Sequence, residues 1–107
     1  MSFENQAVKK DDGKPQLNLV PLEMLIPNGR VREFAKEKYG IDGIEAWREI
    51  EASRILAALL RHTIKYQQDP DGVDEESGLP HSYHMSVNAN FLAIRDMEWF
   101  EAKKVKE

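Results

Sequence analysis

Residues 44–68 read IEAWREIEASRILAALLRHTIKYQQ, and this stretch decides the fold. Its apolar side chains recur at the spacing of one helix face; they are Ile50, Leu56, Leu59, Leu60 and Ile64. The pattern predicts one long helix over the whole stretch, with an irregularity near Ser53. No segment of the chain keeps the two-residue period of a strand, so the expected fold class is all-α.

Upstream of this stretch, prolines, an asparagine and a glycine indicate where two further helices begin and end. Pro21 suits the first position of a short helix, and Pro27 is expected to end it. Asn28 suits the N-cap of the next helix, and Gly40 suits the position just past its last residue. The sequence therefore predicts a helix over residues 28–39.

Downstream, residues 69–80 (DPDGVDEESGLP) combine prolines, glycines and acids, which is typical of a loop. Pro80 suits the first turn of a final helix, predicted over residues 81–104. The chain is therefore expected to form a small bundle of three main helices and one short helix. Residues 17–107 are expected to be this single domain, and the polar residues 1–16 a flexible N-terminal arm.

The composition argues against several classes of protein. The chain has 107 residues, no cysteine and a formal net charge of −4, so thiolate metal sites are impossible and duplex nucleic acid is not an expected partner. No apolar run approaches the ~20 residues of a membrane-spanning helix, and no secretory signal is evident, so a cytoplasmic protein is expected. Because so short a chain buries little surface, we also expect a homo-oligomer.

The final helix carries polar side chains on a stripe that a helical core would fill with apolar ones. At about 100° per residue, one narrow arc of the helix contains His81, His84, Asn88 and Arg95, with large apolar side chains beside them. Buried polar groups lose free energy unless they are hydrogen-bonded. The row therefore predicts a pocket, a metal site or a buried hydrogen-bond network; a purely structural network or an exposed face is the alternative.

Three acids precede this row in the loop, namely Asp74, Glu75 and Glu76. With His81 and His84 they offer carboxylate and imidazole donors within a short span. Such a mixture suits Mg²⁺, Mn²⁺ or Zn²⁺ better than Ca²⁺. The alternative is an acidic, solvated turn that caps the final helix.

The long middle helix adds a basic stripe of Arg54, Arg61 and Lys65. A stripe of this kind either binds phosphates or forms a solvated face, and the sequence leaves both interpretations open. His62 lies on a different side of the same helix, where a packed histidine is a commoner outcome than a ligand.

Several segments together resemble a family of phage and prophage domains labelled dATP/dGTP diphosphohydrolase, N-terminal domain. The resemblance runs from about residue 12 to 93, and its most specific parts are the Arg61-His62 pair and the run from Asp74 through His81 to His84. The other segments are Gly13-Lys14-Pro15, Leu19-Val20-Pro21, Ala35 to Gly40 followed by Trp47, and Asn88 followed by Phe91-Leu92. The family is similar to the all-α nucleoside triphosphate pyrophosphohydrolases of the MazG type.

The resemblance implies cleavage between the α- and β-phosphates of a purine deoxynucleoside triphosphate, which gives the monophosphate and pyrophosphate. It also implies a Mg²⁺ or Mn²⁺ cofactor, which MazG-like enzymes hold with a Glu-x-x-Glu pair and a later Glu-x-x-Asp pair. This chain departs from that pattern. His81 and His84 stand at the later spacing, and the earlier acids Glu33 and Glu37 are four residues apart.

Three hypotheses follow. The first is a metal-dependent purine dNTP pyrophosphohydrolase of phage nucleotide metabolism, in the cytoplasm of a bacterial host. Its metal would be held by Asp74, Glu76, His81 and His84, with Glu76 and His84 also catalytic. Its substrate would contact Lys38, Tyr39, Trp47, Arg61, His62, Lys65 and Asn88, with Tyr39 or Trp47 stacked on the base.

The second hypothesis is a non-catalytic nucleotide binder, such as a phage sponge for a nucleotide immune signal. The third is an interaction module whose polar row only specifies packing.

Overall fold

A computed structural model describes residues 12–106 of the chain and contains helices and turns connected by loops. The α-helices are α2 (Leu25–Tyr39), α3 (Ala52–Gln68) and α4 (His81–Lys106). Four single turns of 3₁₀-helix accompany them: η1 (Leu17–Leu19), η2 (Leu22–Met24), η3 (Ile41–Gly43) and η4 (Ala46–Glu49). Within residues 12–106 there is no β-strand, only an isolated bridge between Val73 and Pro80. The predicted all-α class is confirmed.

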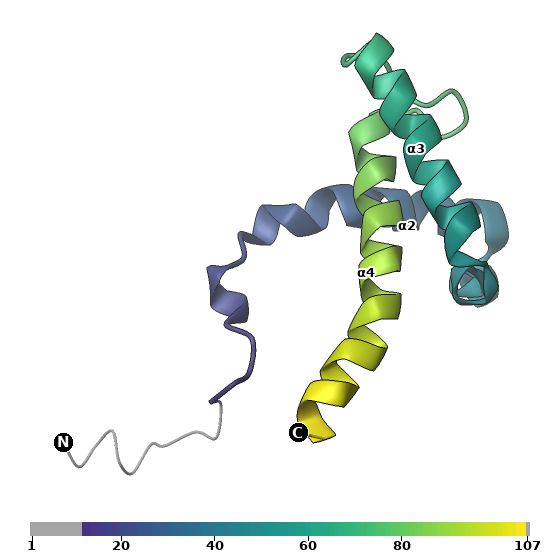
Figure 1. The fold of residues 1–107 in the computed structure, drawn as a ribbon. Coiled ribbons are helices and arrows are strands. Elements are labelled where there is room, and N and C mark those ends of the chain that lie inside the picture. Colours follow the sequence, from purple (N-terminus) through teal and green to yellow (C-terminus); the bar gives the residue numbers. More distant parts are fainter. Residues whose placement is uncertain (1–11, 107) are drawn as a thin grey trace.

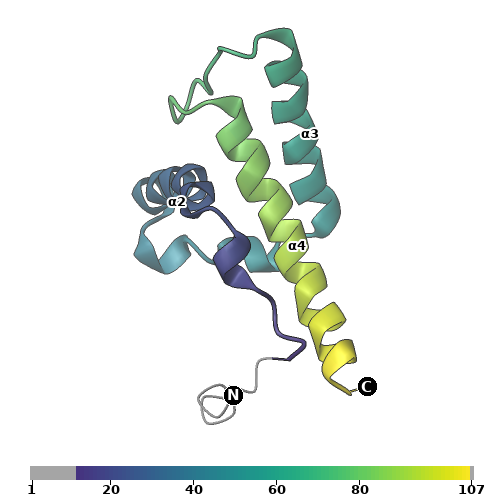
Figure 2. The ribbon, with the colours of Figure 1, turned by 90° about the vertical axis from the view of Figure 1, so that its left-hand side faces the viewer.

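Helix α4 is the centre of the arrangement because it packs against both other helices. Helices α3 and α4 lie side by side and antiparallel, joined by the loop at residues 69–80, while α2 crosses α4 (Figures 1 and 2). Of the predicted arm at residues 1–16, residues 1–11 lie outside the described part, and residues 12–16 are exposed. None of the helices in the described part is long and apolar enough to cross a membrane.

Helix α2 begins earlier than the sequence predicted. The expectation that Pro27 ends a short helix is wrong: the single turn η2 follows Pro21 and leads directly into α2 at Leu25. Pro27 is the third residue of α2. The N–H groups of the first four residues of a helix have no carbonyl acceptor within the helix, so the missing N–H of a proline costs nothing at this position. The first-turn position, rather than the helix end, is therefore the correct interpretation of this proline.

Asn28 is not the predicted N-cap. It lies inside α2, and its Oδ1 accepts a hydrogen bond of 2.9 Å from Ser86 Oγ, which ties α2 to α4. The other end of α2 agrees with prediction. Gly40 follows its last residue with a φ of 78°, a conformation that favours glycine, and its N–H donates to the Lys36 carbonyl at 2.8 Å.

The predicted helix over residues 44–68 is interrupted. After η4, Ile50 and Glu51 are extended, with ψ of 135° and 142°, and α3 starts only at Ala52. The interruption exposes the Ile50 carbonyl to Arg95 of α4, whose Nη1 donates to it at 2.6 Å. A tertiary hydrogen bond thus stabilises a break that lies just before Ser53. The end at Gln68 is as predicted.

The core is small. The buried apolar side chains of the described part are Val31, Trp47, Ile55 and Val87. The Trp47 indole stacks on the Phe91 ring with 4.1 Å between centroids and an interplanar angle of 8°. By contrast, Leu56, Leu60 and Ile64 form one stripe on α3 and are 44%, 51% and 55% exposed.

Candidate functional site

The polar row of α4 lies inward. His81 and His84 are 6% and 8% exposed, and Asn88 is half-buried with its Nδ2 donating to the His84 carbonyl at 2.9 Å. Arg95, further along the helix, donates a hydrogen bond to the Ile50 carbonyl. The row therefore divides into a histidine end, where imidazole nitrogens meet other side chains, and a structural end at Arg95.

The loop before α4 folds back to bring Asp74 against the histidines. The Asp74 N–H donates to the Leu79 carbonyl, and the Gly78 N–H donates to the Asp74 carbonyl, each at 2.8 Å. Gly78 has a φ of 72°, which a side chain would strain. The Asp74 Oδ2 then accepts the backbone N–H groups of Glu76 and Ser77 at 3.1 and 2.9 Å. The acid is thereby fixed in direction.

The environment favours the ionised form of this carboxyl group. Partial burial raises its pKa, but the hydrogen bonds from Ser77 and the nearby His84 lower it, and the net pKa of Asp74 lies below its ordinary value. A carboxylate is therefore present at neutral pH.

Three histidines, from α3 and α4, meet beside this carboxylate. The Nδ1 atoms of His62 and His81 lie 3.1 Å apart. The rings of His62 and His84 stack, with 4.6 Å between centroids and an interplanar angle of 10°. One ligand atom each from His62, Asp74 and His81 lie within 4.8 Å of one another, a spacing at which a single metal ion can be held. Together, His62, His81, His84 and Asp74 form the histidine cluster.

Ser77 belongs to the same surroundings. Its Oγ lies 2.7 Å from His84 Nε2 and accepts the Leu79 N–H at 3.1 Å. The Asp74 Oδ2 is 4.0 Å from that same nitrogen. In a catalytic triad the acid and the serine contact opposite nitrogens of the ring, so this geometry does not form one.

The histidine cluster predicts how stability depends on pH. Burial lowers the pKa values of His62 and His84 below the ordinary 6.5, neighbouring histidines lower them too, and the Asp74 carboxylate only partly opposes this shift. Near and below pH 6.5 the unfolded chain therefore binds more protons than the folded chain does. The stability that these two histidines allow is fully present above that pH and is lost as the pH falls. We expect urea midpoints, measured with EDTA present, to decrease between pH 7.5 and 5.

The matching variant is His62→Gln, which removes one of the two groups. We expect its urea midpoint to change less steeply over the same pH range, where carboxylates contribute little because they titrate lower. A slope as steep as that of the parent protein would show that this histidine is not the source.

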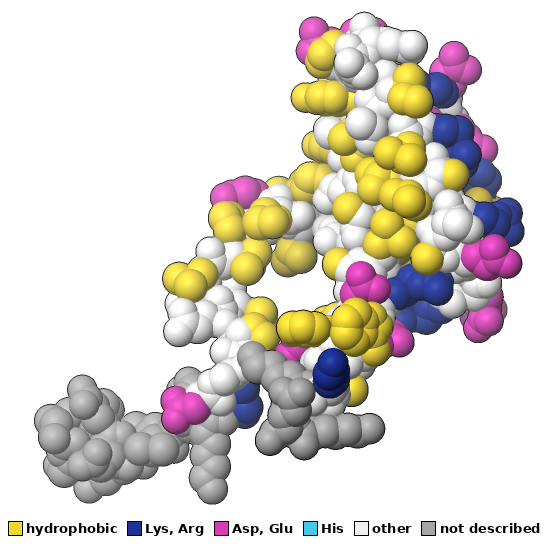
Figure 3. Space-filling model, in the orientation of Figure 1, with side chains coloured by type: hydrophobic (Ala, Val, Ile, Leu, Met, Phe, Trp, Pro, Cys, Tyr) yellow, Lys and Arg dark blue, Asp and Glu magenta, His cyan; other side chains and the backbone are white. Residues whose placement is uncertain are grey.

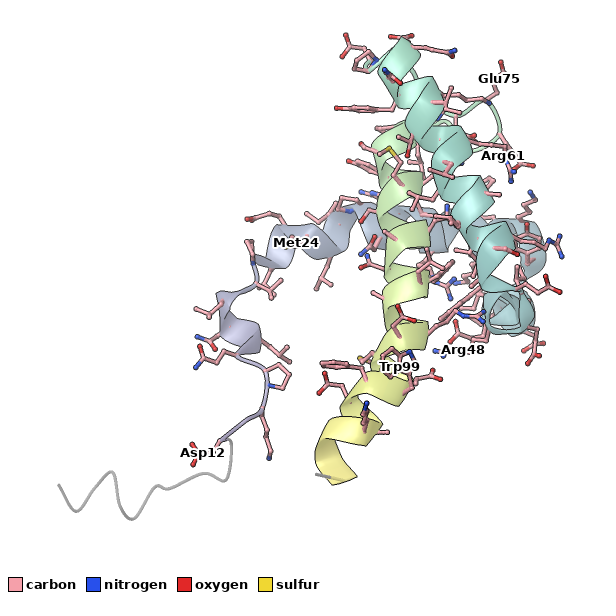
Figure 4. The ribbon with its side chains drawn as sticks, in the orientation of Figure 1. Asp12, Met24, Arg48, Arg61, Glu75 and Trp99 are labelled. Atoms are coloured by element: carbon pink, nitrogen blue, oxygen red, sulfur yellow. The ribbon has the colours of Figure 1, made fainter. Side chains whose placement is uncertain are left out.

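A groove lies between α3 and α4, and its lining residue Asn88 donates to the carbonyl of His84 in the histidine cluster. Its volume is about 400 Å³, and its lining includes Arg54 and Arg61 from α3, Asn88 and Phe91 from α4, and small alanines. Neither arginine has a salt-bridge partner among residues 12–103, whose side chains the structure describes. Lys and Arg side chains gather along this edge of the molecule, and Arg61 projects on the side of the loop residue Glu75 (Figures 3 and 4). The sequence-predicted Arg61 and Asn88 are thus brought together.

The remaining predicted residues are placed in different surroundings. Lys38 of α2 reaches the loop, where its Nζ donates to Glu76 Oε1 at 2.8 Å, and this hydrogen bond raises the pKa of Lys38. Lys65 is exposed on α3, and Tyr39 is exposed at the end of α2. Trp47 is buried against Phe91, so its ring faces offer little room for a base.

The contact between His62 and His81 is what sequence reasoning missed. The sequence predicts that His62 binds substrate, and this stays a prediction, while the structure places its Nδ1 3.1 Å from His81 Nδ1. A signal was available, because a short loop between two helices makes them antiparallel and places the last turns of α3 beside the first turns of α4.

Comparisons with known proteins agree on one family. The sequence model of a family described as dATP/dGTP diphosphohydrolase, N-terminal, matches residues 4–104. A protein of Salmonella phage PMBT28 named dATP/dGTP diphosphohydrolase is 29% identical over 85 residues, which cover 79% of this chain and 28% of the relative. The chain thus spans less than a third of that relative's length. No solved structure matches.

Proposed function

We propose a function on the premise that this chain belongs to the dATP/dGTP diphosphohydrolase N-terminal family, whose model covers residues 4–104. The chain binds a purine deoxynucleoside triphosphate and hydrolyses it to the monophosphate and pyrophosphate, in the cytoplasm of a bacterial host. The name of the phage relative supports the substrate class. The single observation that carries the proposal is the histidine cluster, which Asn88 connects to an arginine-lined groove by its hydrogen bond to the His84 carbonyl.

The groove supplies what a chain of phosphates requires. Arg54 and Arg61 are seven residues apart on α3, so their guanidinium groups follow one side of the groove two turns apart. Guanidinium groups bind phosphate oxygens through paired, charge-assisted hydrogen bonds. Lys65, one turn beyond Arg61, extends the positive charge toward the histidine cluster, where it lowers the pKa of His62. The phosphates would therefore lie along α3 with one end at the cluster.

The magnesium implied by the resemblance needs oxygen ligands, and the described carboxylates do not gather into such a cage. Glu33 pairs with Arg30 at 3.0 Å, and Glu45 pairs with Arg32 and Arg48. Of Mg²⁺ and Mn²⁺, the imidazole and carboxylate donors of the histidine cluster suit Mn²⁺ better. A divalent ion held there would polarise a phosphate oxygen and acidify a bound water.

Among the described groups, we assign His84 as a proton acceptor. Burial lowers its pKa, so the imidazole is neutral at pH 7, and its Nε2 already lies within hydrogen-bond distance of Ser77 Oγ. Glu76, the other predicted catalytic residue, is exposed and paired with Lys38. Its catalytic role stays a prediction.

The proposal is tested by incubating the protein with dATP or dGTP and Mn²⁺ and measuring pyrophosphate. We expect release, and we expect Arg61→Met to raise KM by about 10-fold or more, because one charge-assisted contact contributes about 1.5–3 kcal/mol. Arg30→Met is the matched control, since Arg30 is an exposed α2 residue paired with Glu33. Absence of pyrophosphate with every purine dNTP would contradict hydrolysis.

A non-catalytic nucleotide binder is the second candidate, and the lack of a carboxylate cage favours it. Calorimetry with nucleotides and cyclic nucleotides separates the two functions. A nucleotide that binds and is recovered intact, in the presence of Mn²⁺, supports sequestration. A nucleotide recovered as its monophosphate supports the hydrolase.

We also propose that the protein is a homo-oligomer that buries the apolar stripe of α3, formed by Leu56, Leu60 and Ile64. Hydrophobic side chains gather on the α3–α4 face that includes this helix (Figure 3). The described chain has four buried apolar side chains and leaves this stripe about half exposed. An apolar stripe at helical spacing is self-complementary across a twofold axis, which is the commonest symmetry of oligomers.

A further inference from the structure

We propose that His62, Asp74 and His81 form a binding centre for a zinc-class transition-metal ion, with one coordination position left open. This donor set differs from the one predicted from sequence, because His62 replaces Glu76 and His84. The inference rests on the proposed function for the purpose of the ion. Binding of the ion is measured without nucleotide, so the two proposals can fail separately.

The distance between the two imidazoles supports a shared ion. Two nitrogens that each lie about 2.05 Å from one tetrahedral ion stand about 3.3 Å apart. The Nδ1 atoms of His62 and His81 lie 3.1 Å apart, which is close to that edge length. An N–H···N hydrogen bond also fits this distance, so the position of the third donor decides between the two.

The third donor is a carboxylate held in place by the backbone. The backbone N–H groups of Glu76 and Ser77 both donate to Asp74 Oδ2. Oδ1 receives neither of them, and we assign this oxygen to the ion. All three donor atoms lie within 4.8 Å of one another. A hydrogen bond between the two histidines would explain why His62 and His81 are close, but it would not explain why the Asp74 carboxylate lies beside both.

The chemistry of these donors selects the ion. Two imidazoles and one carboxylate form the three-ligand set that catalytic zinc sites use, with water or substrate in the fourth position. Mg²⁺ prefers oxygen ligands at octahedral geometry and binds imidazole poorly. The family resemblance implied magnesium held by paired carboxylates, and this part of the chain instead supplies nitrogen.

The three donor residues belong to three separate parts of the fold. His62 is on α3, Asp74 is in the loop, and His81 is the first residue of α4. The neighbouring His84 stacks on the His62 ring and fixes its plane without contributing to the donor group. Such outer contacts orient ligands and tune affinity.

The test uses the full chain, stripped with EDTA and then exchanged into chelator-free buffer. Zn²⁺, Co²⁺ and Mg²⁺ are titrated separately by calorimetry, and bound metal is counted by mass spectrometry after gel filtration. We expect about one Zn²⁺ per chain, a visible absorption band from Co²⁺, and no displacement of Zn²⁺ by millimolar Mg²⁺. Failure to retain Zn²⁺, or equal retention of Mg²⁺, would overturn the proposal.

Two variants locate the ion. Asp74→Asn keeps an oxygen for the two backbone N–H groups but removes the charge, and His62→Gln removes one imidazole from a half-buried position. Each is expected to weaken Zn²⁺ binding more than about 100-fold, since even outer contacts are worth 10–100-fold. Asp71→Asn, on an exposed acid of the same loop, is the matched control and should bind Zn²⁺ as the parent does.

Circular dichroism of each variant checks that the helices are retained. If Asp71→Asn weakens binding as much as Asp74→Asn does, the centre is placed wrongly. Zn²⁺ uptake without pyrophosphate release would support the metal centre and contradict the hydrolase function. Pyrophosphate release without Zn²⁺ or Co²⁺ uptake would support the hydrolase function and contradict the metal centre.

Discussion

Trp47→Ala is expected to lower the free energy of unfolding by about 3–5 kcal/mol, the range for removing a buried aromatic side chain. Trp47 is 7% exposed, its indole stacks on Phe91, and its Nε1 donates to Glu45 Oε2 at 3.2 Å. The variant therefore loses a packed surface and a hydrogen bond together. Because domains of this size are stable by only about 5–15 kcal/mol, this loss removes a large fraction of the total stability.

Urea denaturation followed by circular dichroism measures this loss. Trp99→Ala is the matched control, because Trp99 is 58% exposed and its Nε1 donates to the exposed Asp96. We expect the control to lose less than about 1 kcal/mol, as surface substitutions do. Equal losses for the two tryptophans would mean that the stack on Phe91 is not the centre of the core.

The second large effect concerns assembly. The double variant Leu60→Glu and Ile64→Glu is expected to raise the dissociation constant of the oligomer by at least about 30-fold. About half of each side chain is already buried in the monomer, so the interface gains about 2 kcal/mol from the two, and each tenfold in affinity is about 1.4 kcal/mol. Sedimentation equilibrium over a range of protein concentrations measures the change. The expected product is a monomer with its helices retained.

The control for assembly is Lys65→Glu, which introduces the same charge on the same helix. Lys65 is exposed and lies well around the helix from the stripe of Leu60 and Ile64. We expect its oligomeric mass to equal that of the parent. A parent protein that is monomeric at high micromolar concentration, or a double variant that assembles normally, would contradict the proposed interface.

Helix termini that depend on local chemistry were predictable. Gly40 ends α2, Gln68 ends α3 and His81 begins α4, each where the sequence places a glycine, a loop or a proline. The errors arise where one residue type has two local roles. Pro27 fits both a helix end and a first helical turn, and Asn28 fits both an N-cap and a tertiary hydrogen bond.

The sequence indicated an irregularity near Ser53, but the extended backbone at Ile50 and Glu51 could not be predicted, because it depends on a contact between residues distant in sequence. The Ile50 carbonyl is satisfied by Arg95, 45 positions later, and no local pattern at either residue indicates that pairing. The same limit applied to the candidate site. The run from Asp74 to His81 could be grouped from spacing alone, whereas the contact between His62 and His81 depends on how α3 packs on α4.

The buried interior of residues 12–106 has an unusual make-up with a practical consequence. Four of its side chains are apolar, and two more, His81 and His84, are imidazoles. Acidification or oxidation that changes these imidazoles therefore also disturbs the packing of α3 on α4. Substitutions at those two positions are expected to lower the folding yield.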